Sequence, residues 1–411
     1  MKLSVNTDIA LTHLLSGKKQ TMIAALGVTV GIGIFIFLIS LVVGFDRNSD
    51  EDIFKATPHL RIYQDDILSQ PLIPQSNLGY ATVLINPKIA NVSNTLINPE
   101  KIISDLKKQK DVVIATRQVS LNLFYNNGTS QLNGIASGVN IIDANAMFNI
   151  QSTLLAGNIQ NLVSTPNGIF IGVGIARKLN IQLNDNITIV SAIGVVKVMK
   201  VVGIFTTSNT AVDLTKSYIN LAISQQLLHQ SSSYVTDILV NIKDPNKAPA
   251  YAKQYKNLTV YKVEDWQAAN ETLMANKTTR TVMFGSISAA LLLVAAFGIY
   301  NIINMTIRSK LNDIAILKAT GFKGKDVLKI FILESLIMGV IGTSLGLLFA
   351  SVLINALSGV YVGGNIGYFP IGFELKIFVL GSIIGILLTL LAGYIPALNA
   401  AKVDPTEIFR K

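Results

Sequence analysis

The chain has 411 residues, of which 50% are hydrophobic and only 14% are charged, and its mean hydropathy is +0.49. This composition excludes an ordinary soluble domain, so we expect membrane spans. The absence of cysteine excludes disulfides, thiolate metal sites and cysteine nucleophiles, and the net charge of +10 comes without the basic stripe and interleaved aromatics of a nucleic-acid-binding protein.

Four apolar runs are long enough to cross a bilayer core of about 30 Å, which needs roughly 20 helical residues. They cover residues 22–43, 282–305, 330–352 and 377–395. A cleaved signal peptide is the alternative for the first run, but the run is too long and lacks a small-residue cleavage site. The predicted order is an amphipathic helix (1–21), span 1 (22–45), a large domain (46–279), span 2 (280–306), a loop (307–329), span 3 (330–354), a short loop (355–375), span 4 (376–396) and a tail (397–411).

Lysine and arginine near the spans predict their orientation, because these residues stay on the cytoplasmic side. Residues 355–373, between spans 3 and 4, carry no charge. Both termini and the loop 307–329 are therefore expected in the cytoplasm, and residues 46–279 outside it. The flanking cations are Lys18, Lys19, Arg308, Lys310, Lys318, Lys323, Lys325, Lys329, Lys402, Arg410 and Lys411.

The large domain is predicted to be α+β. Segments rich in β-branched residues and bounded by turn formers predict strands at 59–64, 112–135, 184–190, 195–205, 236–242 and 258–263, the second with a hairpin turn at Asn127-Gly128. Helices are expected after the N-cap Asn98 with Pro99, and at 172–179. The Asn- and Pro-rich segment 67–99 fits an ordered arm or a flexible loop equally well.

No enzymatic site is predicted. His13, His59 and His229 are scattered along the chain, so a zinc motif is not expected. The acidic pairs at 65–66 and 264–265 are interpreted as solvated surface groups. The segment TGFKGKD at 320–326 lacks both the first glycine and the hydroxyl residue of a phosphate-binding loop, so we expect no catalytic residue, metal or cofactor in this chain.

The spans predict close helix packing rather than a polar pore. Glycines spaced four residues apart let helix backbones approach, and such pairs occur at 27/31, 342/346 and 381/385. Glu334, near the cytoplasmic end of span 3, is expected to pair with nearby lysines or a helix N-terminus. Few other ionisable groups mark an ion pathway.

The cationic loop contains an apolar segment, NDIAILKATGFKGKD, at 312–326. We expect a short helix capped by Asn312 and ended by Gly321, with Ile314, Leu317 and Lys318 on one face. Such an element can lie on the lipid surface or enter a protein partner.

The segment RSKLNDIAILKATGFKGKDVLKIFILESLIMGVIGTSLG (308–346) resembles the signature of the FtsX/MacB-type ABC transporter permease superfamily, and YIPALNAAKVDPTEIFR (394–410) resembles its closing segment. The resemblance implies a type VII (mechanotransmission) permease subunit of a bacterial inner membrane, without catalysis of its own. Implied partners are two copies of an ATP-binding subunit holding ATP and Mg, a second permease copy or paralogue, membrane lipid, and a periplasmic carrier or adaptor. The implied ATPase-coupling residues are Asp313, Ile314, Ala315, Ile316, Leu317, Lys318 and Gly321.

Within this superfamily, GIFIGVGIARKLNIQLNDNITIVS (168–191) and VEDWQAANETLMANKTTRTVM (263–283) look most like the lipoprotein-releasing (LolC/LolE) branch. That branch implies ATP-driven extraction of lipoproteins through a cavity between spans 1 and 2. Alternatives are a MacB-like exporter of peptides, glycolipids or drugs, and a cell-division-type regulator of a wall hydrolase. The expected cavity residues are Leu38, Leu41, Val42, Phe45, Val282, Met283, Phe284 and Ile287.

Overall fold

The computed structural model describes residues 5–65, 94–207, 209–363, 367–404 and 406. The chain divides into two compact units. The helical unit comprises Met1–Ser49 and Ala275–Lys411, and the α+β unit comprises Asp50–Met274. Most of the segment 67–99, for which the sequence left two interpretations open, lies outside the described residues.

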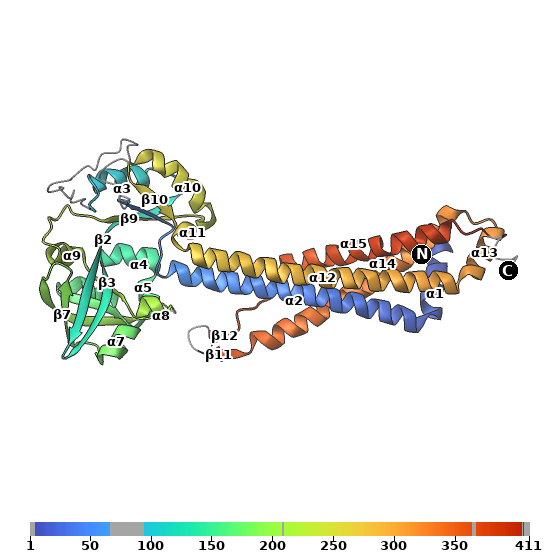
Figure 1. The fold of residues 1–411 in the computed structure, drawn as a ribbon, viewed down its shortest axis with the longest axis horizontal. Helices are drawn as coiled ribbons and strands as arrows, with labels where there is room; N and C mark the ends of the chain where they lie inside the picture. Colours follow the sequence, from blue (N-terminus) through green and yellow to red (C-terminus); the bar gives the residue numbers. More distant parts are fainter. Residues whose placement is uncertain (1–4, 66–93, 208, 364–366, 405, 407–411) are drawn as a thin grey trace, which may run out of the picture. The chain divides into compact units, whose positions relative to one another are not determined.

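Long helices dominate the helical unit. Four of them, α2, α12, α14 and α15, are long and apolar enough to cross a membrane, as predicted, and they run alongside one another (Figure 1). A short hairpin of β11 and β12 lies between α14 and α15 in the chain. The bounds are α1 (Val5–Ser16), α2 (Lys18–Phe54), α12 (Glu271–Ser309), α13 (Leu311–Ala319), α14 (Gly324–Ser358), β11 (Tyr361–Gly363), β12 (Gly367–Tyr368) and α15 (Leu375–Ala401).

Helix α2 packs closely against the other long helices at glycine positions. A Cβ atom added to Gly31 would lie 2.8 Å from the Cβ of Ala295 on α12, and one added to Gly342 of α14 would lie 2.6 Å from the Cβ of Val28. The predicted packing role is confirmed for these two glycines and for Gly346, Gly381 and Gly385. It is wrong for Gly27, where an added Cβ would meet nothing within 4 Å. The glycines at helix contacts are Gly31, Gly342, Gly346, Gly381 and Gly385.

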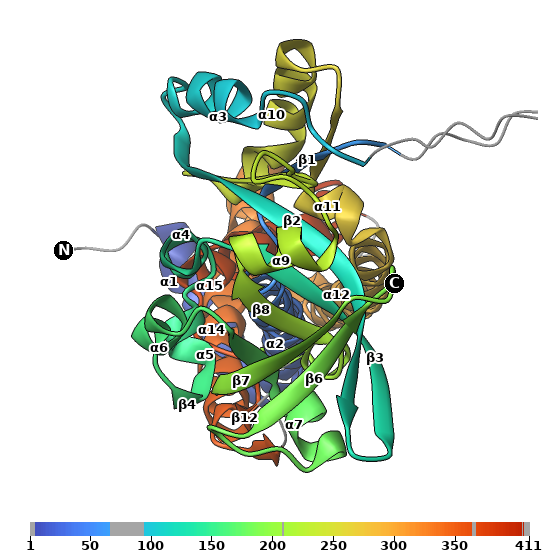
Figure 2. The ribbon, with the colours of Figure 1, turned by 90° about the vertical axis from the view of Figure 1, so that its left-hand side faces the viewer.

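Six strands of the α+β unit close into a ring, in the order β2-β3-β8-β5-β7-β6 and back to β2. Closure leaves these strands no free edge and encloses an apolar core rich in isoleucine and leucine. Figure 2 shows β2 and β3 extending as a long hairpin. The bounds are β2 (Val112–Asn127), β3 (Ser130–Val139), β5 (Gly168–Gly172), β6 (Asn186–Ser191), β7 (Val196–Phe205) and β8 (Lys216–Asn220), with β4 (Leu154–Gly157) added beside β7.

A second lobe begins at the first half of β2, which forms an antiparallel pair with β9 (Asp237–Ile242). β1 (Leu60–Tyr63) lies between β9 and β10 (Lys262–Asp265). The lobe has its own core, which contains the chain's single tryptophan, Trp266, with 2% of its surface exposed. The remaining elements are α3 (Pro99–Lys107), α4 (Ile141–Phe148), α5 (Ile150–Thr153), α6 (Ile159–Ser164), α7 (Val173–Leu179), α8 (Thr210–Asp213), α9 (Leu221–Leu227), η1 (Pro245–Lys247), α10 (Ala248–Tyr255), η2 (Lys256–Leu258) and α11 (Trp266–Ala269).

Several local predictions for this unit need correction. The hairpin between β2 and β3 is confirmed, but its two-residue loop is Gly128-Thr129, where Gly128 has a φ of 58°. Asn98 occupies the N-cap position before Pro99, as predicted, but its backbone is left-handed and its side chain makes no capping hydrogen bond. The strand predicted at 258–263 begins only at Lys262, and Val260 is 95% exposed.

A tyrosine–carboxylate bond in the second lobe predicts a loss of stability at high pH. The hydroxyl of Tyr251 donates to the carboxylate of Asp111, which raises the pKa of Tyr251 to about 12 because the phenolate would lie beside a negative charge. The folded chain keeps this proton between pH 10 and about 12 whereas the unfolded chain releases it. The stabilisation is therefore fully present below pH 10 and is lost as the pH rises towards 12.

We expect Tyr251→Phe to flatten the dependence of unfolding free energy on pH in that window. Urea unfolding of the purified full chain, followed by the fluorescence of Trp266 in the same core, measures it. An equally steep pH dependence in the variant would contradict the assignment.

Candidate functional site

The predicted cytoplasmic helix is present as α13, but its start differs from the prediction. The helix begins at Leu311 with Lys310 in the N-cap position, so Asn312 lies inside it and does not cap it. Its end is as predicted. Gly321 adopts a φ of 107°, and the amides of Gly321 and Phe322 donate to the carbonyls of Lys318 and Leu317, at 3.1 Å each.

The four apolar residues of α13 that are predicted to dock, Ile314 to Leu317, do not all face outward. Ile314 and Ala315 are buried, with 1% and 0% exposed, and Ile314 belongs to the core of the helical unit. The expectation that all four enter a partner's groove therefore needs correction, because these two already pack inside this chain. Leu317 is half-buried, whereas Ile316 is 52% exposed.

Exposed charged residues lie close to this isoleucine in the sequence. Asp313 is exposed, and its carboxylate lies 3.7 Å from the ammonium of Lys310. Lys323 and Lys325 are also exposed, on the turn that leads into α14 and in its first turn. Lys318 differs from them, because its ammonium donates to main-chain carbonyls at the end of α15. An apolar side chain with a charged border is the arrangement that protein interfaces use.

Glu334 has a partner that the sequence did not suggest. Its carboxylate is buried, and it lies 3.9 Å from Nδ1 of His13 on α1. The predicted partners, nearby lysines or a helix N-terminus, are therefore replaced by a buried histidine. Ala10, His13 and Leu14 form the buried face of α1, so the pair connects the N-terminal helix to α14.

The residues expected to line a cavity fall into two groups. On α2, Val42 is buried, Leu38 and Leu41 are half-buried, and the ring of Phe45 packs edge-on against Phe369 with centroids 5.5 Å apart. On α12, three side chains are largely exposed and Phe284 is half-buried. These three are Val282, Met283 and Ile287, with 62%, 50% and 45% exposed.

An ion pair joins α2 and α12 near these residues. Asp46 accepts a hydrogen bond from Arg280, and the ammonium of Lys277 lies 4.0 Å from the same carboxylate. The guanidinium of Arg280 also lies 5.6 Å from the ring of Phe45. The next residue, Arg47, pairs with Glu374 at 2.6 Å, just before α15 begins. α2 is thus held to α12 and to α15 by adjacent residues of opposite charge.

An apolar groove of about 450 Å³ lies between α12 and α15. Its walls are almost entirely hydrocarbon, which suits a membrane-spanning segment in contact with acyl chains or another helix. The lining residues are Leu293, Ala296, Phe297, Tyr300, Ala392 and Ile395.

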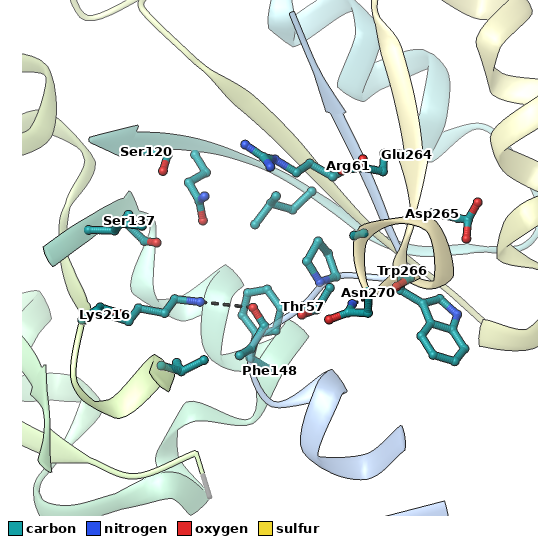
Figure 3. Close-up of a pocket in the computed structure, with 18 residues that line it drawn as sticks. Thr57, Arg61, Ser120, Ser137, Phe148, Lys216, Glu264, Asp265, Trp266 and Asn270 are labelled. Carbon is teal, nitrogen blue, oxygen red and sulfur yellow. Dashed lines mark hydrogen bonds between the residues drawn. The ribbon is translucent and has the colours of Figure 1, made fainter. Parts of the chain in front are cut away.

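A polar cleft of about 330 Å³ lies in the α+β unit (Figure 3). Lys216 donates to the carbonyl of Ala56 at 3.1 Å, and Nε of Arg61 donates to the buried carboxylate of Asp237 at 2.6 Å. Glu264, which lines the same cleft, accepts from Tyr63 at 3.2 Å. Lys216, Arg61 and Glu264 thus each have a partner within the chain. Among the residues that line the cleft, no nucleophile lies in contact with a base, although their polar atoms can bind a polar group.

The acidic pair at 264–265 has structural partners, contrary to the prediction of solvated surface acids. Both residues are half-buried, and Asp265 caps α11 by accepting from the amides of Gln267 and Ala268. Within the described ranges, no three His, Cys, Asp or Glu side chains are grouped to hold a metal ion. The candidate functional features are therefore the exposed face of α13, as a surface for a protein partner, and the contacts among the long helices.

Two family models match this chain. Residues 21–258 match the family model described as MacB-like periplasmic core domain, and residues 285–405 match FtsX-like permease C-terminal. The solved structure of the periplasmic region of MacB from Actinobacillus actinomycetemcomitans covers 52% of this chain and 92% of its own, with 12% identity and a TM-score of 0.34.

Some named relatives match this chain over nearly its whole length, and others match only part of it. The lipoprotein-releasing system transmembrane protein LolC of Neisseria meningitidis is 22% identical over 99% of each chain. The macrolide export ATP-binding/permease protein MacB of Azoarcus sp. is 30% identical, but over 42% of this chain and 26% of its own. With one family model covering more than half of its length and a second covering its last long helices, this chain belongs to the FtsX/MacB family of ABC transporter permeases.

Proposed function

We propose that this chain is the non-catalytic transmembrane subunit of a lipoprotein-releasing ABC transporter. The observation that carries the proposal is the match over 99% of both chains to a LolC protein, whereas the MacB relative is matched over only 26% of its own length. Extracting a lipid anchor costs about 0.8 kcal/mol per CH₂ taken out of the bilayer. A multi-acylated protein therefore needs both an external energy source and an apolar cavity.

The proposed topology follows from charge and helix length. The helices α2, α12, α14 and α15 cross the bacterial inner membrane. The lysine-rich loop that contains α13 and both termini lie in the cytoplasm, and the α+β unit lies in the periplasm. α2 and α12 have 37 and 39 residues. At about 1.5 Å per residue, each is far longer than the roughly 30 Å that a bilayer core requires. They have the length to transmit movement beyond the membrane.

In this proposal the exposed face of α13 docks into the ATP-binding subunit, which holds ATP and Mg. Ile316 supplies the apolar anchor, Leu317 supports it, and Asp313 lies on the charged border. Lipoprotein acyl chains enter between spans 1 and 2, where the exposed apolar face of α12 offers one wall. A second permease copy or paralogue supplies the rest, and a periplasmic carrier receives the product.

A MacB-like exporter is the second candidate, and a specific observation favours it. The family model for a MacB-like periplasmic core domain covers residues 21–258, which include most of the α+β unit, Asp50–Met274. Such an exporter would use the same ATP-binding partner but would deliver its substrate to an adaptor and would need no acyl chain on it.

An ATP-dependent release assay separates the two candidates. The chain and its ATP-binding partner are reconstituted in lipid with a radiolabelled acylated lipoprotein or its non-acylated mutant, and periplasmic extract is added. We expect ATP to move the acylated form into the soluble phase, and to have no effect on the non-acylated mutant, which has no lipid anchor and is soluble with or without ATP. Hydrolysis of ATP without release of the acylated form would reject the lipoprotein-releasing function.

The cavity assignment is tested in the same assay by replacing both Phe45 and Phe284 with aspartate. A charge at membrane depth costs about 2.5–3.5 kcal/mol on insertion scales, so acyl chains should be excluded and release should fall at least about tenfold. Binding of the ATPase subunit, measured by copurification, should be unchanged. Full release by the double variant would show that these two residues do not border the cavity.

A further inference from the structure

We propose that Lys318 fastens α13 to the C-terminal end of α15, so that a movement of α13 reaches α15 directly. The inference rests on the proposed function, because it assigns a route by which the docked helix acts on the membrane segments. Lys318 is thereby a positioning residue and is not part of the surface that meets the ATPase.

The contact joins two segments far apart in the sequence. The ammonium of Lys318 donates to the carbonyl of Ala401 at 2.9 Å and to that of Val403 at 2.6 Å. Ala401 is the last residue of α15. The last four carbonyls of an α-helix have no donor within the helix, and the C-terminus carries partial negative charge. A lysine in this position satisfies the carbonyls and the charge together.

A second close approach brings the chain after α13 to the same helix end. A Cβ atom added to Gly324, the first residue of α14, would lie 2.8 Å from the carbonyl oxygen of Ala401. Ile314 of α13 belongs to the same apolar core as Ala397 and Ala400 of α15, which are both fully buried. α13 thus shares an apolar core with the end of α15, and Lys318, one turn after Ile314, bonds to that end.

The charged residues of the loop around α13 therefore have two different roles: some are available to a partner, and Lys318 binds within the chain. Asp313, Lys323 and Lys325 are exposed and remain available to a partner. Lys318 is half-buried and has its hydrogen atoms directed at main-chain oxygens. A displacement of α13 then pulls on α15 through this bond as well as on α12 and α14, to which α13 is joined along the chain.

The experiment uses the absence of native cysteine, which allows two spin labels to be placed without background. Thr320, just after α13, and Lys402, just after α15, are both exposed and are replaced by labelled cysteines. Pulsed electron resonance in lipid gives the distribution of distances between the labels. The test variant is Lys318→Met, the matched control is Lys325→Met, and Lys318→Arg keeps a charged donor.

We expect Lys318→Met to broaden the distance distribution, and Lys325→Met and Lys318→Arg to leave it narrow. In the complex with the ATPase, Lys318→Met should copurify normally but release at least about tenfold less substrate per ATP, because the variant loses both charge-assisted hydrogen bonds of Lys318. A narrow distribution in Lys318→Met would overturn the inference. Because that measurement needs only this chain, failure of the inference is distinguishable from failure of the proposed function, which would appear as absent release by the unmodified complex.

Discussion

Replacing Ile316 with aspartate should weaken the association of this chain with its ATP-binding subunit by about 100-fold, the effect of losing one anchor at the centre of an interface. Among the four apolar residues predicted to dock, Ile314 to Leu317, Ile316 is the most exposed, and exposed charged residues lie close to it in the sequence. A carboxylate at this position would have to be desolvated without a partner when the complex forms. Copurification of the ATPase from detergent extracts, followed by titration of the purified proteins, measures the loss.

The matched control is Val260→Asp, which puts the same charge on a side chain that is 95% exposed in the α+β unit. This variant should bind the ATPase as the unmodified chain does. A change at Ile314 would not be informative, because that side chain is buried and its replacement would disturb the helical unit itself. Undiminished copurification of the Ile316→Asp chain would mean that α13 is not the docking helix.

The second large effect is expected at the ion pair between α2 and α12. Asp46→Arg should destabilise the helical unit by about 2 kcal/mol, since it removes a charged hydrogen bond and places Arg280 and Lys277 beside a third cation. We expect release of lipoprotein to fall at least about tenfold while the ATPase still copurifies. Thermal unfolding by circular dichroism and the release assay measure the two losses separately.

Exchange of the two charges, Asp46→Arg with Arg280→Asp, is the control. The exchanged pair should recover part of the stability and release, and the recovery should be incomplete because Lys277 would then lie close to an arginine. If the double variant is as impaired as the two single variants added together, the pair contributes no interaction of its own.

Much of the architecture could be predicted because it depends on local patterns. Long apolar runs predicted the four long helices, and β-branched segments predicted the hairpin of β2 and β3. Gly321 ended α13 as expected, because only a residue tolerant of positive φ fits that position. β5 and β8 were missed, since both are short and almost fully buried and therefore show no alternation of polar and apolar residues.

The site was predicted less well, because its decisive contacts join distant segments. Lys318 is held by carbonyls more than eighty positions away, and main-chain partners leave no trace in the side-chain sequence. Glu334 on α14 pairs with His13, which lies near the N-terminus and more than three hundred positions away. Helical spacing correctly placed Ile314 and Leu317 near one face, but it could not say that this face turns inward.

The order of the strands has a consequence for how the α+β unit folds. All strands of the closed ring come from one continuous stretch, β2 to β8, so they can assemble as soon as that stretch is available. The second lobe instead pairs the first strand of the unit, β1, with its last two, β9 and β10. Contacts between such distant segments form slowly. The backbone hydrogen-bonding groups of β1 therefore stay unpaired until β9 and β10 have been synthesised. We therefore expect the ring to form first, and the interval before β10 is made to be the period in which this chain most needs protection from aggregation.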